Sequence, residues 1–328
     1  MTFTHTQSAH CESGALSTLL SAYGYPISEP MIFGLTSSLS FAFLPIVKVN
    51  GLPLVAYRSL PKTIIKRTQN ALHVKMQKHH YTSPVQADAH LRKLLEEGKI
   101  VGLQTGVYYL PYFPKEMRFH FNAHNLVVYG VEGDEYLISD PVFEKPVRCK
   151  KEDLMRARFA KGAFAPKGFL YYPQTQTKEP NLPLTLQHAL RQNAKTMLTP
   201  FPYAGVKGMQ KLAQKITALR HEPNPRHIKN FLTHIIRMQE EIGTGGGGFR
   251  FMYAAFLQEA KAYGLNGDML DEAQQCLIHS GNTLRRFALA CAQASKEPRL
   301  LSSLDPSALL QEAAAHEKRG FSLLRKIH

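Results

Sequence analysis

The sequence predicts an α+β domain followed by an all-α helical domain. Strand-like runs separated by short turns occur through residues 99–172. Beyond residue 184, apolar residues recur almost throughout at the spacing of amphipathic helices. Between these regions, residues 173–183 are polar and proline-rich, which is typical of a linker. A chain of 328 residues is long enough for two domains, and we place them at residues 1–175 and 184–328.

Capping and turn residues mark the elements of the first domain. Ser28 and Ser83 stand just before the first turns of two expected helices, where a serine accepts a hydrogen bond from a free backbone N–H. Asn50-Gly51 suits a type I′ turn and predicts a hairpin, and Gly98 ends the helix that begins after Ser83. A further helix is expected at 11–24. The expected strands are 46–49, 54–57, 99–104, 125–131, 135–139 and 167–172.

The second domain is expected to be a compact helical bundle. Its apolar residues follow the helical period, and no fixed-length repeat is present, which argues against a solenoid. The expected helices are 184–198, 205–220, 225–242, 249–263, 268–293 and 306–325.

Composition indicates a soluble globular protein. Hydrophobic residues make up 44% of the chain and the mean hydropathy is -0.23. No apolar run approaches the roughly 18 residues that cross a bilayer. The first residues lack the features of a signal peptide, so we expect a cytoplasmic protein. The four cysteines are scattered, which indicates neither a disulfide framework nor a zinc knuckle.

The formal net charge of +15 favours acidic partners. No nucleic-acid recognition motif accompanies the charge, and the basic residues are spread along the chain. We therefore do not expect nucleic acid as the partner. An acidic protein fits the charge as well, and plain solubility is the remaining explanation.

Three residues in the first domain suggest nucleophilic catalysis. Cys11 begins an amphipathic helix, where the unpaired N–H groups and the positive end of the dipole favour a thiolate. His124 begins a strand and Asp140 follows the next one, so a base and a residue that orients it lie on neighbouring strands. The backbone N–H groups of Cys11 and Glu12 are natural oxyanion donors, with the Gln7 side chain as a further one.

The same residues can also have purely structural roles. A cysteine at a helix start also serves as a small packing residue, and Asp-Pro also simply starts a turn. His120 and His124 are four residues apart, but this spacing shares a face only on a helix, and the segment reads as a loop running into a strand. We expect no metal site. For His120 three roles stay open: it supports the catalytic residues, it contacts the substrate, or it is structural.

A run of glycines precedes the helix that is expected to begin at Phe249. The segment Gly243–Gly248 is not a Walker loop, because no Lys-Ser/Thr follows its last glycine. It predicts either a tight turn between helices or part of a substrate pocket at the domain interface. The residues proposed for the pocket are Glu241, Gly245, Gly246 and Arg250.

Several motifs resemble one known family. The first domain resembles the N-terminal domain of butirosin biosynthesis protein H, and the second resembles the helical domain of unknown function that commonly follows it. The motifs of the first domain are His10-Cys11-Glu12-Ser13, Ser28-Glu29, Phe33-Gly34-Leu35, the segment 118–124 and Asp140-Pro141. Those of the second are Gly243-Thr244-Gly245-Gly246 and the segment 249–253.

The resemblance implies a papain-like fold, related to the bacteriocin-processing cysteine peptidases, with Cys11 as nucleophile, His124 as base and Asp140 as orienting residue. It departs from those peptidases at one position: they carry an oxyanion glutamine six residues before the nucleophile, where this chain has His5. It also implies an acyltransferase that takes an acyl group from a carrier-protein thioester and passes it to a small-molecule acceptor, an amine or a hydroxyl.

We expect no bound cofactor, because the donor substrate carries the phosphopantetheine, and the expected partner is an acidic acyl carrier protein. The helical domain would act as the substrate-binding lid. Two alternatives stay open: a cysteine hydrolase, either peptidase or amidase, with the same triad, and a non-catalytic basic binding protein.

Overall fold

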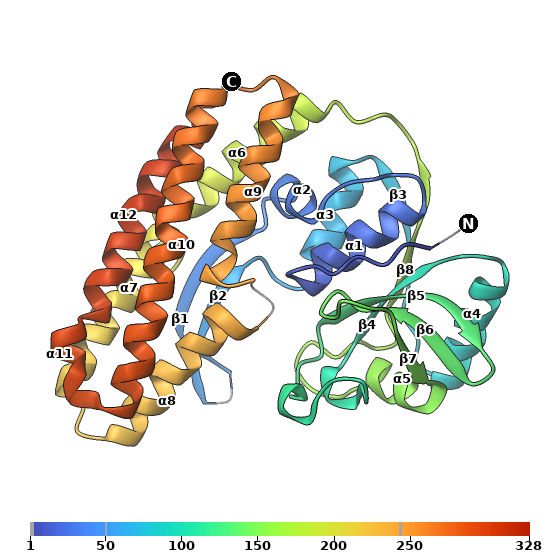
Figure 1. Cartoon of the computed structure of the whole chain (residues 1–328), viewed down its shortest axis with the longest axis horizontal. Helices are drawn as coiled ribbons and strands as arrows, with labels where there is room; N and C mark the ends of the chain where they lie inside the picture. Colours follow the sequence, from blue (N-terminus) through green and yellow to red (C-terminus); the bar gives the residue numbers. More distant parts are fainter. Residues whose placement is uncertain (1–2, 50, 243–244) are drawn as a thin grey trace. The chain divides into compact units, whose positions relative to one another are not determined.

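The computed structural model describes residues 3–49, 51–242 and 245–328, which divide into two units (Figure 1). The first unit contains the chain up to Ile32 together with Pro61–Pro180. The second contains Phe33–Leu60 and Asn181–His328. The expected α+β region followed by helices is confirmed.

A six-stranded antiparallel sheet forms the centre of the first unit, in the order β3-β8-β4-β5-β6-β7. Its strands are β3 Val74–His79, β4 Val101–Thr105, β5 His124–Glu132, β6 Glu135–Ser139, β7 Val147–Lys150 and β8 Leu170–Gln176. The helices of this unit are α1 Cys11–Ala22, α3 Thr63–Ala71, α4 Pro84–Glu96 and α5 Lys151–Arg158, and α2 Glu29–Leu35 spans the boundary at Ile32.

Helices cover the sheet so that its central strand β4 is buried along its whole length. Leu103 of β4 and Leu126 of β5 share one apolar cluster with Leu91 of α4 and Leu154 of α5. Helix α1 also packs against β4 and β5. A strand covered on both faces reads as a continuous apolar run, which explains the pattern of residues 100–103.

Capping explains the helix boundaries of this unit. The Ser83 side chain accepts a hydrogen bond from the backbone N–H of Gln86 at the start of α4, and Gly98, with φ of 73°, follows its end. Ser28 likewise accepts from the backbone N–H of Met31 at the start of α2. The caps predicted from the sequence at Ser28 and Ser83 are therefore confirmed.

Two α-helices of the first unit, α3 and α5, and two of its strands, β3 and β7, were not predicted from the sequence. One consequence concerns the linker, because β8 extends to Gln176 by pairing with β3. Residues 173–176 therefore belong to the sheet and not to the predicted linker. Strand β3 lies about a hundred residues before β8, so no local sequence pattern predicts that the two strands pair.

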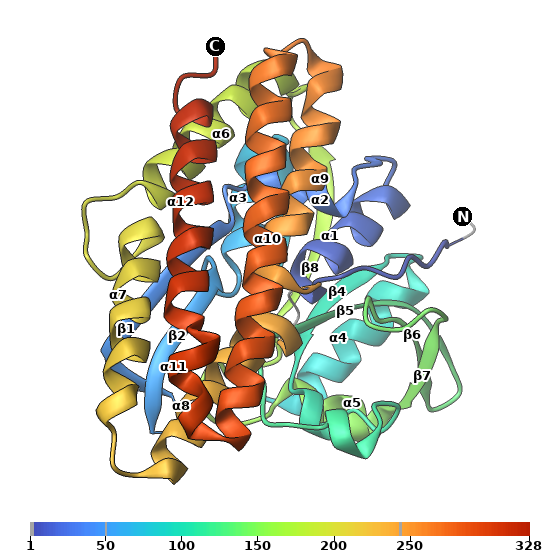
Figure 2. The same cartoon turned by 60° about the vertical axis from the view of Figure 1, so that its left-hand side comes forward.

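The second unit is helical apart from one strand pair. All six predicted helices are present, as α6 Leu182–Met197, α7 Gly205–Ala218, α8 Pro225–Ile236, α9 Arg250–Ala260, α10 Gly267–Lys296 and α12 Pro306–Leu324, with the short α11 Leu301–Leu304 in addition. Helices α10 and α12 run side by side over most of their length (Figure 2). Leu277 and Leu284 of α10 and Leu310 and Phe321 of α12 are fully buried.

The predicted hairpin is present as β1 Leu39–Val49 and β2 Leu52–Arg58, although Asn50 of its turn lies outside the described residues. The hairpin belongs to the second unit, whereas the division at 1–175 and 184–328 assigns it to the first domain. The hairpin is held in the second unit by hydrogen bonds to residues far along the sequence. Asn193 donates to the carbonyl of Leu39 (2.8 Å), and the Phe43 N–H donates to the carbonyl of Tyr203 (2.9 Å).

Among the described residues, none of the helices combines the length and the apolar character needed to cross a membrane.

Gly102 of β4 is expected to tolerate no side chain. A Cβ at this position would lie 2.3 Å from Cζ of the buried Tyr171 ring. Gly102→Ala should therefore lower the free energy of unfolding by about 1–3 kcal/mol, the usual cost of overpacking a core. Urea unfolding measures this loss. The control is Gly267→Ala at the start of α10, where nothing lies within 4 Å. Equal stability of the two variants would contradict the packing argument.

Candidate active site

Cys11 is the first residue of α1 and its side chain is 7% exposed. His10 caps the helix, because its Nδ1 accepts a hydrogen bond from the backbone N–H of Ser13 (3.3 Å). The Cys11 Sγ lies 3.8 Å from the carbonyl oxygen of Ala123, the residue before His124. The thiol thus lies at the positive end of the helix and beside the start of β5.

Glu29 holds the backbone just before the cysteine. Its carboxylate accepts hydrogen bonds from the N–H groups of Ala9 (2.9 Å) and His10 (2.8 Å) and from the Ser13 hydroxyl (3.0 Å). Burial raises the pKa of Glu29, while these hydrogen bonds lower it. Sequence reasoning gave Glu29 only a place at a helix start, because its contacts with residues 9–13 arise from folding.

His124 and Asp140 form a buried pair. The Nε2 of His124 lies 2.7 Å from Oδ2 of Asp140, and the two residues are 3% and 0% exposed. The β5–β6 register explains their meeting: Ser139 pairs with Val127, so the residue after β6 reaches the beginning of β5. Because Asp140 occupies Nε2, the ring nitrogen left to face Cys11 is Nδ1.

Two further donors fix the Asp140 carboxylate. The Tyr112 hydroxyl donates to Oδ2 (2.9 Å) and the Val142 N–H donates to Oδ1 (3.1 Å). Burial and the charge of Asp140 raise the pKa of Tyr112 well above its ordinary value, so its hydroxyl remains a donor. Sequence reasoning missed Tyr112, which lies in an aromatic loop segment, 107–113, with no distinguishing spacing.

The neighbours of His124 stabilise its protonated form. Burial by itself lowers the pKa of His124, but the charge and hydrogen bond of Asp140, followed by the interaction with Cys11, raise it to about 10. The edge of the Phe113 ring packs against the imidazole, with 5.4 Å between the ring centroids. The site therefore favours an imidazolium at His124, beside the Cys11 sulfur.

The expected oxyanion donors differ in what they contact. The backbone N–H of Cys11, at the first position of α1, has no acceptor within the part of the chain that the structure describes. The Gln7 amide donates to the carbonyl of Val142 (3.2 Å), and the Glu12 carboxylate accepts from the N–H groups of Ile64 (3.0 Å) and Ile65 (3.3 Å).

His5 has both ring nitrogens engaged, at 2.7 Å from the Ser139 hydroxyl and 2.9 Å from the Phe143 carbonyl. The histidine at the position of the peptidases' glutamine therefore anchors the N-terminal segment to the loop around Asp140. The Cys11 N–H therefore stays available as an oxyanion donor, whereas the Gln7 amide is engaged elsewhere.

His120 makes its ring contact with Tyr108 and not with the His124–Asp140 pair. Its ring is exposed and stacks on Tyr108, with 4.2 Å between centroids. Within the described ranges, no group of three or more histidine, cysteine or acidic side chains is arranged to hold a metal ion.

Arg250, one of the expected substrate-binding residues, is fully buried in the second unit. Its Nε and Nη2 bind the Glu317 carboxylate (2.8 and 2.9 Å), and its Nη1 donates to the carbonyl of Gly248 (2.7 Å). These contacts commit the guanidinium to the interior, so the assignment of Arg250 to a substrate pocket is corrected. A buried arginine needs a paired carboxylate, and Glu317 supplies it from α12.

The remaining candidates of the second unit lie around the glycine loop. Glu241 is exposed and pairs with Arg237 (3.3 Å), whereas its neighbour Glu240 accepts a hydrogen bond from the Gly247 N–H (3.1 Å). Gly245 and Gly246 have φ of 64° and 83°. Gly243 and Thr244 lie outside the described residues. A role of Glu241, Gly245 and Gly246 in acceptor binding stays a prediction.

The pKa of His124 predicts a loss of stability at alkaline pH. Since the folded-state pKa of about 10 exceeds the ordinary value of 6.5, the imidazolium stabilises the fold fully below pH 6.5. This contribution is lost as the pH rises from 6.5 through about 10. Asp140→Asn removes the charge that raises the pKa, so most of this pH dependence should disappear.

Urea unfolding at pH 6, 8 and 10 measures the effect. The exposed Asp134→Asn is the matched control and should retain the wild-type pH dependence. An alkaline loss of equal size in Asp140→Asn and wild type would refute the assignment.

Two family models match this chain. The model of the N-terminal domain of butirosin biosynthesis protein H matches residues 10–141, a segment that contains Cys11, His124 and Asp140. The model of a domain of unknown function (DUF4872) matches residues 152–324. This second match begins in α5, within the first unit of the structure.

A crystal structure from Bacillus anthracis, described as a C39-like peptidase, is similar to 54% of this chain and 96% of its own, with 15% identity and a TM-score of 0.39. Among curated proteins, none is significantly similar in sequence. In the first unit, the helix-terminal thiol of Cys11 lies beside a histidine–carboxylate pair on an antiparallel sheet. The chain belongs to the family in which an N-terminal domain of the butirosin biosynthesis protein H type is followed by the DUF4872 domain.

Proposed function

We propose that this protein is a cysteine-dependent acyltransferase that takes an acyl group from a carrier-protein thioester and passes it to an amine or hydroxyl. The observation that carries the proposal is the meeting of Cys11, at the N-terminus of α1, with the buried His124–Asp140 pair. The family is named for a biosynthetic protein, which favours transfer to a metabolite over protein degradation.

In the first half-reaction, the Cys11 thiolate attacks the thioester carbonyl carbon, and a carbon–sulfur bond forms as the carbonyl π electrons move to oxygen. The Cys11 N–H stabilises this oxyanion. When the intermediate collapses, the bond to the donor sulfur breaks, and the departing thiolate takes the proton of the His124 imidazolium. The products are acyl-Cys11 and a free carrier thiol.

In the second half-reaction, the acceptor attacks acyl-Cys11 while neutral His124 removes its proton. The tetrahedral intermediate then expels the Cys11 thiolate, which restores the ion pair with the imidazolium. Asp140, held by Tyr112 and Val142, keeps the imidazole oriented through both steps.

The net charge of +15 supports an acidic carrier protein as the donor. A positive surface raises the association rate of an acidic partner, and the effect falls as salt screens the charges. We therefore expect the rate of Cys11 acylation by the carrier-bound donor to decrease as the ionic strength rises.

Intact-protein mass spectrometry tests the acyl-enzyme directly. Mixed with an acyl-carrier thioester and no acceptor, the wild-type protein should gain the mass of one acyl group on Cys11, and Cys11→Ala should gain none. Cys276→Ala, which removes a buried cysteine of α10, is the control and should be acylated like the wild type.

Adding amines distinguishes transfer from hydrolysis. An acyltransferase releases acyl-amine and little free acid, whereas a hydrolase releases free acid with or without amine. Acyl transfer by Cys11→Ala at the wild-type rate would overturn the proposal.

Selective alkylation is a second prediction. Burial raises the pKa of Cys149 to about 12 and raises those of Cys276 and Cys291 as well. At pH 6, iodoacetamide should therefore modify Cys11 first, at least about tenfold faster than the other three, because thiols react through the thiolate. Peptide mapping after brief labelling measures the order. Faster labelling of any other cysteine would contradict the activated state of Cys11.

A further inference from the structure

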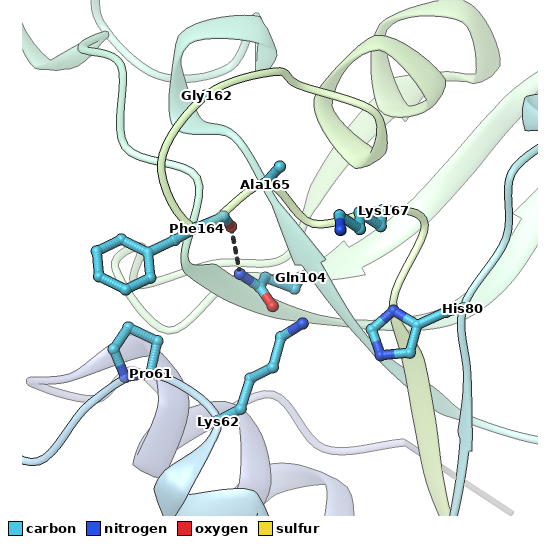
Figure 3. Close-up of a pocket in the computed structure, with 8 residues that line it drawn as sticks. All are labelled: Pro61, Lys62, His80, Gln104, Gly162, Phe164, Ala165 and Lys167. Atoms are coloured by element: carbon cyan, nitrogen blue, oxygen red, sulfur yellow. Dashed lines mark hydrogen bonds between the residues drawn. The ribbon is translucent and has the colours of Figure 1, made fainter.

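An open pocket of about 630 Å³ lies in the first unit, separate from the residues of the triad. It is formed by the segment before α3, the end of β3, β4 and the loop between α5 and β8 (Figure 3). Its lining residues are Pro61, Lys62, His80, Gln104, Gly162, Phe164, Ala165 and Lys167.

Basic side chains converge on this pocket. Lys62 is half-buried, while His80 and Lys167 are exposed at the rim, and none of the eight lining residues is acidic. Lys62 Nζ lies 4.4 Å from the centroid of the Phe169 ring, on which His80 also stacks at 4.7 Å. Burial and the charge of Lys167 lower the pKa of Lys62, and burial and the charge of Lys62 lower that of His80. A bound anion would offset this mutual repulsion.

Gln104 adds an unsatisfied acceptor to the pocket. Its side chain is 1% exposed, and its Nε2 donates to the carbonyls of Asn122 (2.8 Å) and Phe164 (3.1 Å). The opposite amide orientation would set Oε1 against these carbonyl oxygens, so the orientation is determined. Within the described part of the chain, Oε1 has no hydrogen-bond partner, and it faces the pocket beside Lys62 (Figure 3). A ligand that enters the pocket with an N–H group can supply the donor that this buried acceptor lacks.

Short connections link the pocket to the catalytic residues. Lys62 precedes α3, whose first N–H groups, at Ile64 and Ile65, bind the carboxylate of Glu12, the residue after Cys11. Gln104 of β4 pairs with Asn125, the residue after His124. Two residues that line the pocket, Lys62 and Gln104, are therefore positioned by residues adjacent to Cys11 and His124 in the sequence.

We propose that this pocket binds the phosphate-bearing arm of the acyl donor, with Lys62, His80 and Lys167 holding the phosphate and Gln104 Oε1 accepting a hydrogen bond from an amide N–H of the arm. The assignment deepens the proposed function and rests on it, since a carrier-bound thioester brings a phosphate and amides on one phosphopantetheine chain. The two lysines supply the positive charge that recognises the phosphate, His80 adds an imidazole N–H donor, and the buried acceptor recognises the chain beyond the phosphate.

Isothermal titration of the full-length protein tests the site. Wild type should bind 4′-phosphopantetheine at least about tenfold more tightly than pantetheine, because charge-assisted hydrogen bonds to the phosphate are strong. Lys62→Gln/Lys167→Gln should abolish this preference. Lys195→Gln/Lys229→Gln, which removes two exposed lysines of the second unit, should retain it. Equal binding of the two ligands by wild type, or an unchanged preference in the first double variant, would overturn the proposal.

Two further arms identify the ligand chemistry. Gln104→Leu should weaken phosphopantetheine and pantetheine by the same factor, because it removes the amide acceptor and leaves the phosphate contacts. Inorganic phosphate should bind much more weakly than phosphopantetheine. Phosphate binding as tight as that of phosphopantetheine would reduce the pocket to a simple anion site and overturn the assignment to the arm.

Acylation kinetics separate this proposal from the proposed function. The lysine double variant should slow acylation of Cys11 by a carrier-bound thioester about tenfold or more and leave acylation by a phosphate-free N-acetylcysteamine thioester unchanged. If no thioester acylates Cys11 but binding of phosphopantetheine depends on the lysines, acyl transfer falls and the pocket stands. If both donors acylate Cys11 and neither rate depends on the lysines, acyl transfer stands and the assignment of the pocket falls.

Discussion

The buried Asp140 carboxylate is the interaction on which the candidate site depends. One carboxylate, fully removed from solvent, receives His124, Tyr112 and the Val142 N–H. A buried charge is stable only when its hydrogen-bonding capacity is filled, so these partners must stand together. The same charge keeps His124 protonated despite burial, which would otherwise favour the neutral ring. The Asp140 carboxylate therefore determines both the orientation of the His124 ring and its protonation state.

Two other carboxylates perform the corresponding task around Cys11. Glu29 binds the backbone before the cysteine, and Glu12 binds the first N–H groups of α3. Both receive backbone N–H donors from another part of the chain, so each ties two segments that are distant in sequence. Through Glu12, the position of α1 is linked to Lys62, and hence the thiol to the cationic pocket. The proposed nucleophile and the proposed donor site are therefore connected through Glu12 and α3.

The second unit uses a buried ion pair for structure. Arg250 and Glu317 are both fully buried, and the guanidinium also binds the Gly248 carbonyl, so α9, α12 and the glycine loop are joined at one point. Removing either partner would leave an uncompensated charge in the interior. This explains why an arginine beside a glycine-rich loop, a pattern that also suits anion binding, is here part of the core.

The sequence by itself determined the elements with strong local signals. These are the helices of the second unit, the capped α4, the hairpin, the central strands and the cysteine at a helix start, because helix period, caps and turn residues act over a few positions. The pairing of His124 with Asp140 was also within reach, since a short turn joins their strands. Tertiary structure alone decided the contacts of Tyr112, Glu29 and Arg250, the placement of β1 and β2 in the second unit, and the pocket around Lys62 and Gln104. Each of these depends on hydrogen bonds or ion pairs between residues far apart in the chain, whose energy exists only once folding has brought the partners together and excluded water.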